Sequence, residues 1–542
     1  MTAPRNTPNV QSRCPVLRAA WVAMLVAMLA PWGASSIAWS ADEVRAIDIG
    51  SRRELLIDNF LVQRLQGAEL RLHHPIPQGL ALVHDAKWEG TGSGYHSVFR
   101  DGDLYRMYYK AWHLDAQQGK LNTGSHPLFC CYAESDDGVT WRKPNLGLVE
   151  FNGSKENNIV IASGEMTGPG GGLLSVDAGH PAIFKDDNPM VADDARYKAI
   201  LRASSPNGLV PLKSPDGLHW SPMSDEPILH GLGAFDSQNL AFWDPTIGKY
   251  RAYWRFFTSG KTGDKVWQPA GYRAIRTATS DDMLHWSKPV DLTYADSPPE
   301  QLYTNQIKPY PRAPHLLIGF PTRYLDRGWS VSMEALPELE HRKLRASSTQ
   351  RYGTAITEGL LMSSRDGTHF NRWNEAFLPP GPERPGTWNY GQQYIAWHAV
   401  ETKSPLPGAP NELSLYAGES YWTGSGSALR RYTLRLDGFV SVRAPMRGGE
   451  LLTKLISFKG DTLHFNFSTS AAGGIRVELQ DSGGTPIAGY TLDDCPVLFG
   501  DTIDRVVTWK KGDRLAHLNG QPVRLRIELK DADLYALQFT DE

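Results

Sequence analysis

Four carboxylic acids in this 542-residue sequence lie where a strand-like run of residues begins or ends. Asp236 precedes such a run, and Asp177 follows the glycine-rich residues 168–172. Glu89 lies in a short aromatic loop, and Glu419 follows an apolar run. Two carboxyl groups in different environments can serve as an acid and a base. These four are candidate catalytic residues, and turn capping or an ordinary solvated or structural position is the alternative role of each.

Eight further side chains have the chemistry to bind a polar ligand. Most of them lie just ahead of, or at the start of, a predicted strand. Arg323 could bind a carboxylate or sulfate with two parallel hydrogen bonds, or could pair with a local acid. The alternative for the two histidines is a buried position with satisfied hydrogen bonds. The eight candidates are His96, His180, Gln238, Asn305, Arg323, Trp388, Asn389 and Tyr390.

Metal and cofactor signals are weak in this sequence. His73 and His74 have no further ligand at metal spacing, and the cysteines show no zinc-site spacing. Asp186 and Asp187 could bind calcium, but turn chemistry accounts for them fully. No phosphate-binding loop is present. We therefore expect no metal at the site and no cofactor, and the alternatives are a structural calcium ion or a metal site on the axis that includes His96 and His180.

Three cysteines follow residue 40, which is an odd number. Cys130 and Cys131 are adjacent on a predicted strand, so their side chains point to opposite faces. We interpret all three as buried small apolar residues, and a disulfide bond to Cys495 is the alternative.

A seven-residue motif recurs along the chain and organises it. Ser, Asp and an aromatic residue keep their places in four copies, and Gly follows the Asp in three of them. Asp-Gly pairs form tight turns because Gly accepts a positive φ and the Asp side chain bonds the backbone two residues on. Each copy is therefore predicted to be a β-hairpin tip. The copies are 135–141, 214–220, 280–286 and 364–370, with a degraded fifth copy at 435–440.

The strands predicted around these tips form five four-stranded units. Five such units in series predict an all-β fold with a five-bladed β-propeller, in which radial packing leaves only short sheet edges. After Gly449 the pattern changes to short alternating strands, which predict a C-terminal β-sandwich. The predicted divisions are a signal peptide at 1–40, a leading segment at 41–83, the propeller at 84–445 and the sandwich at 446–542.

The propeller geometry predicts where the candidate residues meet. The innermost strand of each blade delivers its first residues to one axial funnel, so polar residues about 70 positions apart become neighbours. Asp236 is expected at this funnel, with Asp177, His180, Asn305 and Asn389 around it. Apolar residues follow Asp236 in its strand. A carboxyl group against such a wall could stay protonated and act as a general acid.

The tip at 280–286 resembles the recurring S-x-D-L-x-H-W hairpin of the five-bladed propeller glycoside hydrolases of families 32, 43 and 68. A propeller followed by a β-sandwich is similar to the family 32 arrangement, and the resemblance covers roughly residues 80–542. It implies three acidic positions at the axial mouth. Here the first falls near Ser93 and Gly94 without an acid, the second holds His180, and the third holds Asp236. The resemblance therefore implies a divergent member.

The amino-terminal residues predict export. Three arginines precede an apolar run at 19–30, and Ala38-Trp39-Ser40 offers small residues for cleavage before Ala41. An uncleaved anchor helix is the alternative, although the run is short for a membrane span. We expect a secreted or periplasmic protein without membrane attachment after cleavage. The net charge of -3 makes nucleic acid an unexpected partner.

These observations together predict a secreted glycoside hydrolase that acts on a poly- or oligosaccharide in the axial funnel. One alternative is a non-catalytic carbohydrate-binding propeller, which would keep aromatic and amide side chains without a matched carboxyl pair. Another is a phosphorylase or lyase on the same fold, which would need a cationic anion site beside the acid. The fold alone does not choose among them.

Overall fold

The computed structural model describes residues 45–263, 266–424 and 426–541 of the chain. The predicted signal peptide at 1–40 lies outside the described residues. Residues Ala46–Glu542 form one compact unit whose regular secondary structure is mostly β-strand. No helix in the described part of the chain is long and apolar enough to cross a membrane.

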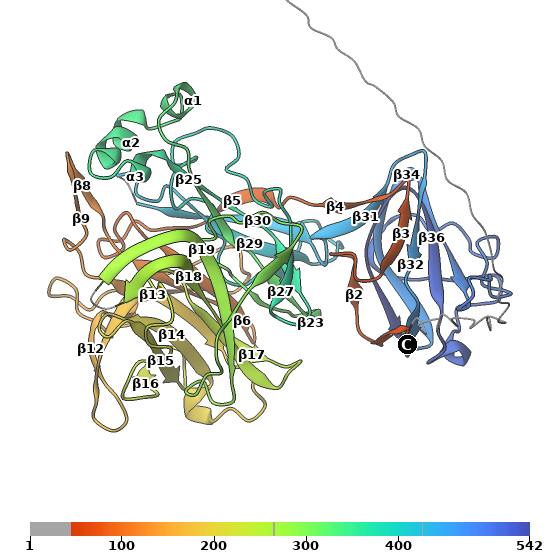
Figure 1. The fold of residues 1–542 in the computed structure, drawn as a ribbon, viewed down its shortest axis with the longest axis horizontal. Helices are drawn as coiled ribbons and strands as arrows, with labels where there is room; N and C mark the ends of the chain where they lie inside the picture. Colours follow the sequence, from red (N-terminus) through yellow and green to blue (C-terminus); the bar gives the residue numbers. More distant parts are fainter. Residues whose placement is uncertain (1–44, 264–265, 425, 542) are drawn as a thin grey trace, which may run out of the picture. The chain divides into compact units, whose positions relative to one another are not determined.

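Five sheets of four or five strands follow one another along the chain, which confirms the predicted five-bladed propeller (Figure 1). The first blade contains β6 (Gly94–Asp101), β7 (Leu104–Ala111), β10 (Phe129–Ser135) and β11 (Ile159–Ala162). Between β7 and β10 the chain forms a separate small hairpin of β8 (Asp115–Gln117) and β9 (Lys120–Asn122). The second contains β12 (Gly164–Thr167), β13 (Leu173–Lys185), β14 (Tyr197–Ala203), β15 (Gly208–Ser214) and β16 (Ser221–Pro222).

The third and fourth blades are joined by a parallel strand pair. The third contains β17 (Leu240–Asp244), β18 (Lys249–Gly263), β19 (Val266–Ser280) and β20 (Val290–Asp291). The fourth contains β22 (Lys308–Tyr310), β23 (Ala313–Gly319), β26 (Met362–Ser364) and β27 (His369–Arg372). Its outer strand β27 pairs in parallel with β21 (Thr293–Ala295), which directly follows the third blade.

An excursion interrupts the fourth blade between β23 and β26. Strands β24 (Thr322–Asp326) and β25 (Ala355–Gly359) pair with each other and carry three short helices between them. Ser330 caps α1 by accepting a hydrogen bond from the Met333 amide. The helices are α1 (Val331–Glu334), α2 (Leu339–Ala346) and α3 (Arg351–Thr354). Sequence analysis did not predict them.

The fifth blade closes the ring with a strand from the amino-terminal side. Strands β28 (Val400–Thr402), β29 (Glu412–Glu419) and β30 (Ala428–Arg435) are followed in the sheet by β5 (Ile76–Val83). Sequence analysis placed residues 41–83 in a leading segment before the propeller, whereas β5 pairs with β30 through register partners such as Leu82 and Leu429. The two ends of the propeller segment are thereby hydrogen-bonded together.

Eight of the ten remaining strands of the described chain form one sheet packed against an apolar core, and the other two pair with each other. The order β3-β32-β36-β31-β4 is extended by β2, β34 and β35, while β1 pairs with β33. Strands from the predicted leading segment 41–83 therefore belong to this sheet as well as to the fifth blade. The strands are β1 (Ile47–Gly50), β2 (Glu54–Leu55), β3 (Val62–Gln66), β4 (Glu69–Leu72), β31 (Val440–Ala444), β32 (Gly449–Thr453), β33 (Ile456–Phe458), β34 (Thr462–Gln480), β35 (Asp501–Val506) and β36 (Arg524–Thr540).

The four predicted hairpin tips share one hydrogen-bond pattern. In the first, the Asp137 carboxylate accepts from the amides of Val139 and Thr140, and the Gly138 amide donates to Ser135 Oγ. The tips at 214–220, 280–286 and 364–370 repeat these bonds. Met283 takes the glycine position of the third tip with a φ of 66°. Each tip follows the third strand of its blade when the second blade is counted from its long strand β13, which confirms the predicted equivalence.

The degraded fifth copy differs from a tip. Asp437 is buried and accepts hydrogen bonds from Tyr310 Oη at 2.8 Å and Arg312 Nε at 2.9 Å. It lies between β30 and β31, where the chain leaves the fifth blade. Its carboxylate binds residues of the fourth blade to the segment between β30 and β31 instead of capping a hairpin.

The three cysteines of the described chain are free and buried. Cys130 and Cys131 lie on β10, and burial raises the pKa of both thiols. The alternative of a disulfide bond to Cys495 is therefore not realised. Asp186, one of the two candidate calcium ligands, instead binds Lys198 and the hydroxyl of Tyr250.

Candidate active site at the axial mouth

The first strands of the blades meet at the propeller axis through buried amide side chains. Gln238 Nε2 donates to the carbonyl oxygens of Tyr95 and Pro181, both at 3.0 Å, and its Oε1 accepts from Gln306 at 2.6 Å. Gln238 therefore links four blades and is not free to bind a ligand. Asn305 is also buried, and its Oδ1 accepts from the Ile307 amide at 3.3 Å.

Asp236 is the most exposed of the four candidate acids. Its side chain is 38% exposed and forms an ion pair with Arg255, which is itself buried. Arg255 comes from β18, the second strand of the same blade, and its guanidinium lies 4.7 Å from the ring centre of Tyr303. Sequence analysis expected apolar neighbours for this carboxyl group. The structure places the Arg255 guanidinium there instead.

Asp177 and His180 form a hydrogen-bonded pair at the same mouth. Asp177 Oδ2 lies 3.0 Å from His180 Nδ1 and 3.3 Å from Arg202 Nη1, and its Oδ1 accepts from the Gly179 amide. Burial alone would raise the pKa of Asp177, but His180, Arg202 and the amide hold it well below its usual range. The His180 ring lies 5.5 Å from that of Tyr95. Asp177 is thus an ionised partner that orients His180.

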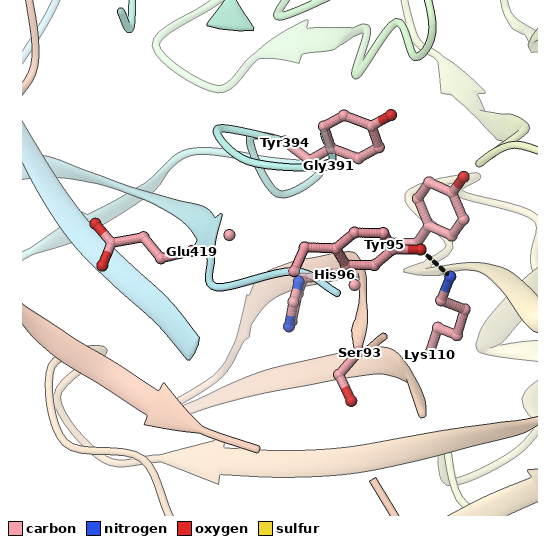
Figure 2. A pocket seen from close by; sticks show the side chains of 10 residues that line it. Ser93, Tyr95, His96, Lys110, Gly391, Tyr394 and Glu419 are labelled. Carbon is pink, nitrogen blue, oxygen red and sulfur yellow. Dashed lines mark hydrogen bonds between the residues drawn. The ribbon is translucent and has the colours of Figure 1, made fainter. Parts of the chain in front are cut away.

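The other two candidate acids are held in ion pairs away from Asp236. Glu89 is fully buried and accepts from Tyr109 Oη at 2.6 Å and from Lys143 Nζ at 2.7 Å. Glu419 pairs with Arg384 and Arg430. Figure 2 shows the Glu419 carboxylate pointing away from Tyr95 and Lys110.

The excursion of the fourth blade holds several of the predicted binding residues. Arg345 of α2 donates to Asn389 Oδ1 at 2.9 Å, and Arg342 donates to the Trp388 carbonyl at 2.8 Å. The indole of Trp388 donates to the Gly381 carbonyl. Tyr390 is buried, and its hydroxyl donates to Tyr303 Oη at 3.0 Å. Only Tyr390 of these predicted residues joins the aromatic cluster described below.

Two further predicted binding residues are engaged elsewhere. His96 is buried with its Nε2 3.1 Å from His84 Nε2, and burial lowers its pKa well below the usual value. Arg323 pairs with Glu358 and Glu300. The local pairing that sequence analysis offered as the alternative for Arg323 is therefore the one observed.

A cluster of tyrosines lies at the mouth, and sequence analysis proposed only Tyr390 of its members as a binding residue. Tyr303 contacts Tyr390 and Tyr394 with ring centres 6.0 and 5.5 Å apart, and Tyr394 lies 6.1 Å from Tyr95. Tyr324 and Tyr352 also pack against Tyr390, as does Tyr421. The tyrosine cluster therefore comprises Tyr95, Tyr303, Tyr324, Tyr352, Tyr390, Tyr394 and Tyr421.

Sequence analysis also missed Lys110. It is only 4% exposed, and its Nζ donates to Tyr421 Oη at 2.9 Å, a bond drawn in Figure 2. Burial lowers the pKa of Lys110 to about 7, although Asp177 opposes this shift. A sequence signal existed, because Lys110, Arg202 and Arg255 each follow an apolar run in the second strand of a blade. Second strands run back toward the mouth.

Two cavities lie near the propeller axis. The one at the mouth is lined by Tyr95, Lys110, Tyr394 and Glu419 and holds about one water molecule (Figure 2). A larger cavity of about 510 Å³ lies where the first strands end, and Trp243, Lys308 and His398 are among its lining residues. No group of three or more His, Cys, Asp or Glu side chains in the described chain is arranged to hold a metal ion.

Comparison with known proteins gives similarity only at the level of the fold. No protein-family model matches the chain, and no curated protein sequence matches it. A solved structure named as a glycoside hydrolase is 13% identical, with a TM-score of 0.39 over 66% of this chain and 92% of that one.

Two further solved structures also carry glycoside hydrolase names. A family 43 arabinoxylan arabinofuranohydrolase from Bacillus subtilis, in complex with cellotetraose, is 12% identical, with a TM-score of 0.38 over 85% of this chain and 99% of that one. A glycosyl hydrolase from Bacteroides ovatus is 15% identical, with a TM-score of 0.34 over 70% and 93%. Similarity this low assigns no activity to the chain.

Proposed function

We propose that this protein is a secreted glycoside hydrolase whose active site is the axial mouth. The observation that carries the proposal is the exposed Asp236 carboxylate at a mouth that also holds the Asp177–His180 pair. The tyrosine cluster adds amphipathic ring surface, on which a sugar can pack while its hydroxyl groups find hydrogen-bond partners.

The residues at the mouth can divide the proton transfers of hydrolysis. Asp236, held in place by Arg255, removes a proton from a water molecule, whose oxygen forms a bond to the anomeric carbon. His180, oriented by Asp177 and protonated before the step, gives its proton to the glycosidic oxygen as the bond to that oxygen breaks. This assignment reverses the role that sequence analysis gave Asp236, because the observed neighbour of Asp236 is a guanidinium and not an apolar wall.

Non-catalytic carbohydrate binding is the second candidate. It is favoured by one observation, which is that all four predicted carboxylic acids form ion pairs with cationic side chains. Such pairs can fix the geometry of a binding surface without any turnover.

A panel of oligosaccharides incubated with the wild-type protein tests the proposal. Hydrolysis predicts new reducing ends that form equally with and without inorganic phosphate. Phosphate-dependent products indicate a phosphorylase, and products that absorb ultraviolet light as unsaturated sugars indicate a lyase. Binding without any product, measured by calorimetry on the same panel, contradicts hydrolysis and supports the binding protein.

Export is part of the same proposal. The basic and apolar residues before Ala41 support cleavage and secretion. Amino-terminal sequencing of the mature protein should begin near Ala41. Mature protein that still begins at Met1 contradicts the proposal.

A further inference from the structure

We infer that the axial mouth binds an acidic saccharide, one whose ring carries a carboxylate or a sulfate group. The inference rests on the proposed function only in taking the mouth as the site. The cations around the tyrosine cluster outnumber the acids there. The cations are Lys110, Arg202, Arg255, Arg273 and Arg351, and the acids are Asp177 and Asp236. Glu419 also lines the mouth cavity, but its charge is balanced by Arg384 and Arg430.

Three of these cations form no ion pair with any acid in the described part of the chain. Arg273 donates to the amide oxygen of Gln301 at 2.9 Å, and its guanidinium lies 4.6 Å from the ring centre of Tyr324. Arg351 donates to Tyr352 Oη, and Lys110 donates to Tyr421 Oη. The groups that accept these hydrogen bonds are neutral, so no acid compensates the charges of Arg273 and Arg351, nor that of Lys110 below its pKa of about 7.

The tyrosine rings compensate this charge only in part. A ring face attracts a cation by about 0.5–2 kcal/mol, but it offers no acceptor along the N–H directions of a guanidinium. Arg255 Nε and Arg273 Nε are buried without a hydrogen-bond partner, as are the hydroxyls of Tyr324 and Tyr394. Buried polar groups are rarely left in this state. These four groups point to a ligand with several acceptor oxygens.

An acidic saccharide fits both observations. Its anionic group supplies acceptor oxygens for guanidinium N–H groups, a pairing that is short and strong because it is charge-assisted. Its ring hydroxyls can bond the free tyrosine hydroxyls, and its carbon face can pack on the tyrosine rings. A neutral saccharide would cover the mouth and leave the buried charges unpaired, which is unfavourable.

Calorimetric titration of the mature protein with matched oligosaccharides tests the inference. The probes are an oligogalacturonate, a sulfated galactose oligosaccharide and a neutral galactose oligosaccharide of equal length. We expect one of the two acidic probes to bind at least about tenfold more tightly than the neutral one, and comparison of the two distinguishes carboxylate from sulfate. Equal affinity for all three probes overturns the inference.

Variants localise the binding. Arg273→Gln should weaken binding of the acidic probe about tenfold or more without affecting the neutral one. The matched control is Arg276→Gln, three residues along β19, because Arg276 pairs with Asp291 away from the mouth. If Arg273→Gln does not fold, Arg351→Gln serves the same purpose from α3. Trp243→Ala alters the larger cavity. If this variant loses binding of the acidic probe while Arg273→Gln retains it, the inference is overturned.

The outcomes also separate the inference from the proposed hydrolase. Tight binding of an acidic probe that is never cleaved supports the inference and contradicts hydrolysis. If the neutral and acidic probes bind with equal affinity and both are cleaved, the result supports hydrolysis and contradicts the inference.

Discussion

Lys110 is a buried amine whose protonation should affect stability. Its pKa of about 7 lies below the value of about 10.4 for an exposed lysine, so between these values the unfolded chain binds more protons. The contribution of Lys110 to the free energy of unfolding should therefore rise as the pH increases from 7 toward 10. Lys110→Met should be stabilised relative to wild type at pH 6, and that gain should shrink by about 2–3 kcal/mol at pH 9.

Thermal unfolding of both proteins at several pH values measures this difference. Lys120→Met, on the exposed hairpin β8–β9, is the control and should follow the wild-type profile. A gap between wild type and Lys110→Met that does not change with pH contradicts the burial of a titrating amine.

Positions at the mouth could be predicted from the sequence, whereas their partners could not. The axial placement was inferred because three residues lie before or within the first strand of a blade, namely Asp236, Asp177 and His180. Their ion-pair partners Arg202 and Arg255 come from second strands, and no sequence spacing fixes such a pairing. The general-acid role predicted for Asp236 rested on an apolar wall, and the structure places the Arg255 guanidinium beside this carboxyl group instead.

At the scale of elements, three of the four hairpin tips are each fixed to the neighbouring blade by a tyrosine. Tyr108 of the first blade donates to the Gly217 carbonyl at 3.0 Å, and Tyr253 of the third blade donates to the Gly367 carbonyl at 2.9 Å. Tyr416 of the fifth blade bonds the Gly138 carbonyl in the same way. All three tyrosines lie on second strands, so the bond recurs with the blade repeat.

Removing one of these hydroxyls should weaken the contact between blades. Tyr108→Phe removes one of the two donors to the Gly217 carbonyl, the other being Trp220 Nε1, and should lower the free energy of unfolding by about 1 kcal/mol. Chemical denaturation measures the loss. Tyr272→Phe is the control, because that side chain is 46% exposed on β19. Equal stability of Tyr108→Phe and wild type contradicts the contribution of the tip contact.

The tips were the elements that sequence could predict best, because Asp and Ser side chains satisfy the turn backbone locally. Even Met283, which breaks the Asp-Gly pattern, takes the same left-handed conformation. The excursion with α1, α2 and α3 could not be predicted in this way. Its helices are four to eight residues long and lack a sustained apolar period, and they are held by contacts such as Arg345 with Asn389.

At the scale of the whole molecule, β5 closes the propeller by pairing with β30. Leu82 of β5 is 5% exposed and packs in the core shared by the first and fifth blades, while Leu80 of the same strand is 48% exposed. Leu82→Ala should lower the free energy of unfolding by about 2–4 kcal/mol through lost burial and a residual cavity.

Leu80→Ala is the matched control and should change stability by less than about 0.5 kcal/mol. Melting temperatures of the two variants measure the contrast. Equal effects of both substitutions contradict the closure by β5. The closure of the propeller by β5 could not be predicted, because pairing between strands more than 300 residues apart leaves no local sequence signal.

The turnover number of Asp236→Asn tests the central claim most directly. On the best substrate of the oligosaccharide panel, Asp236→Asn should lower kcat by about 100-fold or more with little change in melting temperature. Asp291→Asn is the control, since Asp291 pairs with Arg276 on the same blade at its outer strand. It should leave kcat unchanged. Wild-type turnover in Asp236→Asn would contradict the axial mouth as the site of hydrolysis.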